Sequence, residues 1–333
     1  MNLRIKSLPP LIAVLSIGLA TASPAIAATS DSLSSARSAF TSGRADDALR
    51  FLSTAIGKNS ANAVAWNLQC RVYLAQGRWD EAINSCRHAV ELVPASSMYH
   101  LWLGRAFGEK ASHAKLLSAY KIAKLVHAEF EIAVSLDGRN PEALSDLGEY
   151  YVDAPGFLGG SDSKAEDLAE RLDTLSPARA WELRASIAEK KKDYAGAEQD
   201  WRAKIAASQT SAEAAAQAWM DLGSFYRRRG RWNDMLTALE NGAAADTQHG
   251  PALVDGASTL IKADREPQLA AQWLREYLSG NALSAEAPAF AVHAELGKLL
   301  KKQGDLLAAN REFAIANALS ANYSATSASG SAE

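Results

Sequence analysis

The chain has 333 residues, a formal net charge of −3 at pH 7 and an apolar fraction of 48%, as expected of a globular protein. A chain with this weakly acidic net charge need not have a strongly basic surface. The net charge therefore argues against a nucleic-acid-binding protein. The six histidines are scattered without metal-ligand spacing, so neither a metal nor any other cofactor is expected.

The first 27 residues have the pattern of a signal peptide. Arg4 and Lys6 precede an apolar run over 11–20 that is too short to span a bilayer comfortably. The sequence Ala25-Ile26-Ala27 then fits a small-x-small cleavage site, so we expect cleavage after Ala27, with an uncleaved anchor as the alternative. The mature chain is expected to be soluble, without stable membrane insertion, and periplasmic or secreted, where the environment is oxidising.

A helix–turn–helix pattern recurs along the rest of the chain. Gly43 and Gly77 lie 34 residues apart, and "GRWDEA" from Gly77 returns as "GRWNDM" from Gly230. Trp66 and Tyr73 fall on one face of a predicted first helix, and the glycine that follows permits a tight turn. One such hairpin cannot bury its own apolar face, so the hairpins must stack on one another.

This pattern resembles the tetratricopeptide repeat, and the resemblance covers nearly all of residues 28–320. It implies an all-α fold, a right-handed α-solenoid of about eight helix–turn–helix repeats. The first helices are expected to start near Thr29, Ala63, Ser97, Pro141, Ala178, Ala216, Gly250 and Phe290. Small polar residues over 321–333 predict a disordered tail.

Two hairpins are longer than the repeat. The third carries an amphipathic insertion in which Leu116, Leu117 and Tyr120 recur at roughly helical spacing. The fourth carries "APGFLGGSDSK", whose Phe157 and Leu158 are candidate recognition residues. Both insertions fall between the two helices of a hairpin, so they should be neighbours at one edge of the solenoid, where insertions often bind partners. An unselected lengthening of a surface turn is the alternative.

No pattern in the chain supports catalysis. The segment "APGFLGGSDSK" lacks the glycine spacing, the preceding strand and the lysine motif of a phosphate-binding loop. No Gly-x-Ser-x-Gly sequence occurs, and paired acids such as Asp80 and Glu81 fall at solvated turns. We therefore expect no catalytic residues.

Cys70 and Cys86 are the two cysteines, and both belong to the second hairpin. Their repeat positions face each other across the two helices, so a disulfide is plausible in an oxidising compartment. Two buried thiols remain the alternative.

The resemblance also points to a peptide-binding groove. In the family, the residue after the small position of each first helix points into the concave surface, and here that position holds Arg37, Arg71, Arg105 and Glu149. Asn67 lies one turn before Arg71. Such a surface is similar to grooves that grip peptide carboxylates, since the guanidinium fork suits bidentate binding. Equally, each arginine could pair with an acid on an adjacent helix.

A second basic patch, "FYRRRGRW", contains Arg227, Arg228, Arg229 and Arg231. Arginines at a turn usually form a solvated end, and contact with a phosphate or a lipid head group is the alternative.

The leading functional hypothesis is a non-catalytic scaffold or adaptor of the bacterial envelope. Its partner would be a protein or peptide, with an acidic or C-terminal segment in the groove. One alternative is an assembly factor for an outer-membrane export or polysaccharide machine. Another is an enzyme or sugar-binding protein with its site at the edge that carries the two insertions. A deep pocket there, lined by acids and aromatics, would favour that last alternative.

Overall fold

The computed structural model describes residues 24–323, with side chains described from Asp31 onward. Sixteen α-helices and one short 3-10 helix, η1, form this part of the chain. They are α1 (Pro24–Thr41), α2 (Ala45–Lys58), α3 (Ala63–Ala75), α4 (Trp79–Leu92), α5 (Ser97–Ser112), α6 (Leu116–Leu136), α7 (Pro141–Asp153), η1 (Gly156–Leu158), α8 (Asp162–Leu175), α9 (Pro177–Lys190), α10 (Tyr194–Ala207), α11 (Ala212–Arg228), α12 (Trp232–Ala245), α13 (Pro251–Ala263), α14 (Pro267–Ser279), α15 (Ala289–Lys302) and α16 (Leu306–Leu319).

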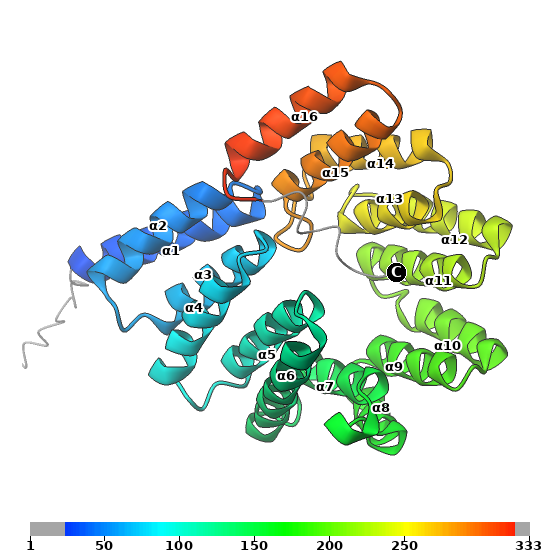
Figure 1. The fold of residues 1–333 in the computed structure, drawn as a ribbon, viewed down its shortest axis with the longest axis horizontal. Helices are drawn as coiled ribbons and strands as arrows, with labels where there is room; N and C mark the ends of the chain where they lie inside the picture. Colours follow the sequence, from blue (N-terminus) through cyan, green and yellow to red (C-terminus); the bar gives the residue numbers. More distant parts are fainter. Residues whose placement is uncertain (1–23, 324–333) are drawn as a thin grey trace, which may run out of the picture.

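The helices pair into eight hairpins, from α1 with α2 to α15 with α16, which confirms the predicted all-α solenoid (Figure 1). The second, third and fourth hairpins begin at the expected residues. Their starts are fixed by Asn62, Ser96 and Asn140, each of which accepts a hydrogen bond from a backbone N–H of the first turn. The predicted signal sequence falls mainly before Pro24, outside the described residues, and its cleavage after Ala27 remains a prediction.

The stack of hairpins curves until its two ends meet, so the solenoid is a closed ring (Figure 1). Phe290, at the start of α15, is fully buried in one apolar cluster with Phe40 of α1 and Leu68 of α3. The Gln76 side-chain amide donates a hydrogen bond of 2.9 Å to Ser320 Oγ across the same junction. The open groove expected from the sequence is therefore the inner face of a ring, formed by the first helix of each hairpin.

Residues 321–323 contribute to this closure, so the predicted disordered tail starts too early. The backbone N–H of Ala321 donates a hydrogen bond of 2.8 Å to Asp46 Oδ2 on α2. The ring of Tyr323 lies edge-on against that of Phe290, with 4.9 Å between centroids. The small polar composition predicts disorder, but the Tyr323 ring packs on the buried Phe290 and the Ala321 N–H bonds to Asp46, which anchors these three residues. The rest of the predicted tail lies outside the described residues.

Cys70 and Cys86 are bonded to each other and are fully buried between α3 and α4. Their Cα atoms lie 5.3 Å apart, within the usual range for a disulfide. The bond joins the two helices of the second hairpin, next to the ring junction.

We expect the purified, unfolded and unreduced protein to contain no titratable thiol. Reduction should release two thiols, because the bond links the two cysteines of the chain. Titration with a chromogenic thiol reagent measures this, and a Cys86→Ala variant calibrates the assay because it should yield one thiol. Two thiols before reduction would rule out the disulfide.

Candidate functional site

The first half of the inner face carries a group of four side chains that we call the Arg–Trp cluster: Asn67 and Arg71 on α3, and Trp102 and Arg105 on α5. The guanidinium carbons of Arg71 and Arg105 lie 4.6 Å and 4.7 Å from the centroid of the Trp102 ring system. One indole therefore contacts two cations, an arrangement stabilised by the electron-rich face of the ring. It requires negative charge nearby to offset the repulsion between the two guanidinium groups.

Arg105 obtains that negative charge from the next hairpin. Asp146 on α7 accepts hydrogen bonds of 2.6 Å and 3.2 Å from its guanidinium, and Glu142 lies 3.0 Å away. The prediction that Arg105 is available to a ligand is therefore wrong in this structure. Here the alternative holds, in which the arginine pairs with acids on an adjacent helix.

Arg71 and Asn67 differ from Arg105 because their donors lack acceptors. Asn67 is buried, and its Nδ2 forms no hydrogen bond. The Nε of Arg71 is also buried without a partner, and within the described residues Arg71 forms no salt bridge. Burial lowers the pKa of Arg71, and the neighbouring charges include Glu142, Arg105 and Arg37. Buried donors without acceptors are costly, so this spot favours a ligand that supplies acceptor oxygens.

Arg37 lies on α1, exposed at the edge of the Arg–Trp cluster. In the described part of the chain it forms no ion pair, although its charge affects both Arg71 and Tyr99. The structure thus brings Arg37, Asn67, Arg71 and Arg105 to one region of the inner face, with unsatisfied donors on α3.

Glu149 does not join the arginines. It lies one turn beyond Asp146 on α7, next to a cavity of about 610 Å³ whose walls include Asp153, Glu182 and Trp201. Burial raises the pKa of Glu149 to about 8, and the negative charges of Glu182 and Asp153 act in the same direction. Its Oε1 has no hydrogen-bond partner. Glu149, expected from its repeat position to face the groove, thus lines this cavity among other acids and lies apart from the arginines.

The two insertion residues have different environments. Leu158 is buried beneath the loop, and the Tyr150 hydroxyl donates a hydrogen bond of 2.7 Å to its carbonyl. Phe157 is exposed, and its ring lies edge-on against Tyr120 of α6 at 5.6 Å. The insertions of the third and fourth hairpins are therefore neighbours, as expected. Leu158 packs within the fold, so it is not a recognition residue, whereas Phe157 remains accessible.

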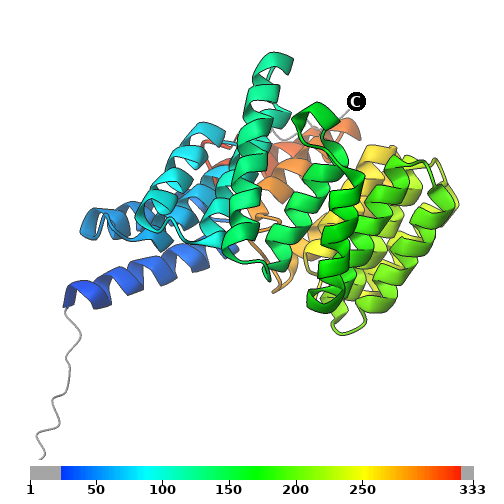
Figure 2. The same ribbon diagram turned by 90° about the horizontal axis from the view of Figure 1, so that it is seen from below.

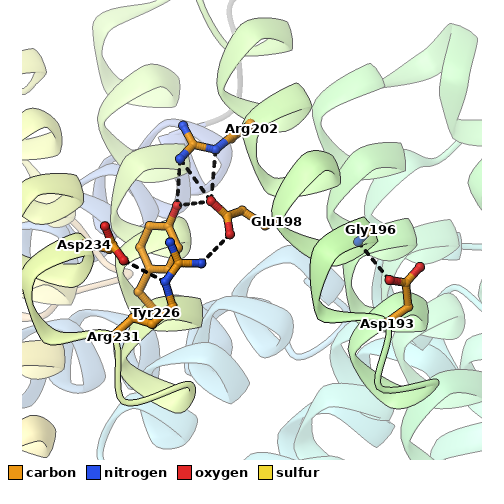
Figure 3. Close-up of polar contacts among 7 residues, drawn as sticks. All are labelled: Asp193, Gly196, Glu198, Arg202, Tyr226, Arg231 and Asp234. Carbon is orange, nitrogen blue, oxygen red and sulfur yellow. Dashed lines mark hydrogen bonds and ion pairs between the residues drawn. The ribbon is translucent and has the colours of Figure 1, made fainter.

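Two arginines of the second basic patch, Arg228 and Arg231, are neutralised by acids. Arg231 binds Glu198 and, at 2.6 Å, Asp234, while the Tyr226 hydroxyl donates to Glu198 at 2.7 Å (Figure 3). Arg228 pairs with Glu189 at 2.7 Å, and Arg229 stacks on Tyr194 at 4.2 Å. Arg228 and Arg231 thus join neighbouring hairpins, whereas Arg227 and Arg229 form no salt bridge in the described residues, and Arg227 Nε is buried without a hydrogen-bond partner.

Sequence reasoning missed three residues of the Arg–Trp cluster and its surroundings: Trp102, Glu142 and Asp146. Trp102 precedes Arg105 by one helical turn, so a search of that face for aromatic residues would have found it. Glu142 and Asp146 are four residues apart on the next first helix, which is the spacing that lets both carboxylates reach one guanidinium.

The described residues offer neither a metal site nor a membrane span. No group of three or more His, Cys, Asp or Glu side chains there is arranged to hold a metal ion. None of the helices in residues 24–323 combines the length and the apolar character needed to span a bilayer.

Residues 39–104 match the family model of the tetratricopeptide repeat. No curated protein matches the chain. Among solved structures, a tetratricopeptide repeat protein from Parabacteroides merdae ATCC 43184 is 15% identical, with 83% of this chain and 98% of that chain covered and a TM-score of 0.48. TTC0263, a thermophilic TPR protein in Thermus thermophilus, is 18% identical over 63% of this chain and 99% of its own, with a TM-score of 0.47.

The assignment rests on the matched residues and on the hairpins themselves. The matched segment runs from the end of α1 to the middle of α5, and hairpins of the same form continue from there to α16. The chain contains tetratricopeptide repeats, matched by the family model over residues 39–104.

Proposed function

We propose that this protein is a non-catalytic adaptor of the bacterial periplasm that binds a carboxylate-bearing peptide segment of a partner protein at the Arg–Trp cluster. The repeat fold is one that binds protein partners. Export is supported by the signal-peptide pattern of residues 1–27, and the Cys70–Cys86 bond accords with an oxidising compartment.

The observation that carries the proposal is the pair of buried donors without acceptors, Asn67 Nδ2 and Arg71 Nε. A carboxylate has two oxygens and about four acceptor positions, so one group can accept from both donors once the side chains that bury them move aside to admit it. Hydrogen bonds between ionised partners are the strong ones, and Arg71 has no competing carboxylate bound to it. The carboxylate can belong to an acidic side chain or to a peptide C-terminus.

The neighbouring surfaces restrict how such a peptide lies. The face of Trp102 is already covered by Arg71 and Arg105, so the indole holds the two guanidinium groups in place. Beyond Asp146 the inner face becomes acidic, with Glu149, Asp153 and Glu182 around one cavity. A peptide that is acidic at one end and basic further along matches this sequence of charges.

The test is selection of peptides with free C-termini on the purified protein, followed by titration of the selected peptides by fluorescence anisotropy. Arg71→Gln should weaken binding about 10- to 100-fold, because a hydrogen bond to a charged group is lost. Amidation or esterification of the peptide carboxylates should weaken binding similarly.

Arg311→Gln is the matched control, since Arg311 is exposed on α16 and forms no salt bridge within the described residues. Thermal unfolding of both variants checks that each remains folded. Equal affinities of the two variants for every selected peptide would contradict the proposal.

A further inference from the structure

The third and fourth hairpins together form an apolar projection that the proposed function does not use. We call it the α6 tip and define it as Leu116, Leu117 and Tyr120 of α6 with Phe157 of η1. The side chains of Leu116, Leu117 and Phe157 are 66%, 78% and 71% exposed. The ring contact between Tyr120 and Phe157 makes the two segments one continuous surface.

The α6 tip extends beyond the body of the ring. α6 has 21 residues, whereas α4 and α8 have 14 each. At 1.5 Å per residue, the additional turns add about 10 Å to the length of the helix. Figure 2 shows this helix standing out from one face of the ring. The two exposed leucines belong to its first turn.

The α6 segment of the tip carries charge of one sign. Lys115, Lys121 and Lys124 are exposed, and none of them forms a salt bridge in the described part of the chain. No aspartate or glutamate occurs between Lys110 and Ala128 in the sequence. Some exposed lysines elsewhere, such as Lys190 and Lys191, instead pair with acids of the preceding hairpin.

Exposed leucines alone would not identify a ligand. Leu306 and Leu307 at the start of α16 are 59% and 66% exposed, but Asp305 directly precedes them and α16 has the ordinary length of 14 residues. The α6 tip combines apolar side chains, aromatic rings and unpaired lysines on a projection. Interfacial membrane-binding segments have this combination, in which apolar groups enter the head-group boundary and lysines meet lipid phosphates.

We propose that the α6 tip docks the ring peripherally on an anionic lipid bilayer. Leu116, Leu117 and Phe157 enter the boundary between head groups and acyl chains. Tyr120 lies at the head-group level, where aromatic residues with a polar group are favoured. Lys115, Lys121 and Lys124 contact the lipid phosphates. The protein remains outside the bilayer core and is held on its surface by one face of the ring.

The experiment is co-sedimentation of the purified protein with vesicles of phosphatidylcholine alone and of phosphatidylcholine with about 30% phosphatidylglycerol. We expect binding to the anionic vesicles and little binding to the neutral ones, with weaker binding as salt increases. The triple variant Leu116→Ser/Leu117→Ser/Phe157→Ser should lose binding. The triple variant Lys115→Gln/Lys121→Gln/Lys124→Gln should bind about 100-fold more weakly, because each lysine near an anionic surface contributes roughly fivefold.

Leu306→Ser/Leu307→Ser is the matched control and should bind like the wild type. Thermal unfolding checks that all variants stay folded, which is expected because the altered side chains are exposed. The proposal is overturned if the wild type does not bind anionic vesicles, if it binds neutral vesicles equally well, or if the serine triple variant binds like the wild type. Crosslinking of the α6 tip to a protein, without vesicle binding, would identify a protein partner instead.

Discussion

Replacing Glu149 with Gln should stabilise the protein at pH 9 by about 2–4 kcal/mol and leave its stability at pH 5 nearly unchanged. The carboxyl is buried on α7 beside Glu182 and Asp153, which raises its pKa from 4.5 to about 8 in the folded protein. A glutamine has nearly the same shape and carries no charge, so it should avoid the cost of ionising a buried acid.

The sign of the pH dependence follows from which state binds the proton more tightly. Folded Glu149 keeps its proton up to about pH 8, whereas the unfolded chain releases it near pH 4.5. Its contribution to stability is therefore fully present below about pH 4.5 and is lost progressively as pH rises through 8. A shift of this size corresponds to at most about 5 kcal/mol, and rearrangement or water entry around the carboxylate reduces that figure.

Urea unfolding monitored by circular dichroism between pH 5 and pH 9 measures this dependence. The wild type should lose stability across the interval, and Glu149→Gln should show a flatter curve. Glu240→Gln is the control, because Glu240 is exposed on α12 and pairs with no cation in the described residues. Parallel curves for wild type and Glu149→Gln would show that the carboxyl ionises without cost.

The sequence predicted the features of the fold that depend on local pattern. Trp66, Gly77 and their counterparts recur with the repeat, and a helical hairpin is the structure that such spacing specifies. The same register placed the two insertions at one edge and the two cysteines opposite each other. These predictions depend only on which face of each helix a residue occupies, and the periodicity of the sequence indicates that face.

The candidate site was harder to predict because its chemistry depends on contacts between hairpins. The register placed Arg71 and Arg105 on the same face, but it did not show that Asp146 of the next hairpin binds one arginine and leaves the other without an acceptor. Likewise, Glu149 has the repeat position of the arginines, yet its neighbours on α9 make it a buried acid. Repeat position predicts which face of the helix a side chain occupies, whereas its partners depend on which residues the next hairpin places opposite it.

Ring closure also depends on contacts between hairpins, in this case the first and the last. Gly43 reads in the sequence as an ordinary turn glycine, like Gly77 or Gly304. In the structure, a Cβ atom on Gly43 would lie 2.5 Å from the backbone nitrogen of Ala289, at the start of α15. No pattern within one repeat reports this contact, because the two residues come together only after the whole stack has curved. The junction also brings Glu286 close enough for its charge to act on Arg71.

Gly43→Ala should therefore open the ring. The residue has φ +70, a left-handed conformation that costs a residue with a side chain about 1–2 kcal/mol, and the added methyl group collides with backbone that cannot turn away. Overpacking of this kind costs about 1–3 kcal/mol more. The first and last hairpins should separate, and small-angle scattering should show a larger maximum dimension.

Gly304→Ala separates the cost of the left-handed backbone from the cost of the collision. Gly304 has φ +88 and no atom within 4 Å of its added Cβ, so this variant has the same backbone cost without the collision. It should lose some stability and keep the scattering profile of the wild type. If Gly43→Ala gives the same scattering and the same melting temperature as Gly304→Ala, the junction is not a fixed contact. If the ring opens, peptide affinity at Arg71 should change with it, because Glu286 then leaves the neighbourhood of that arginine.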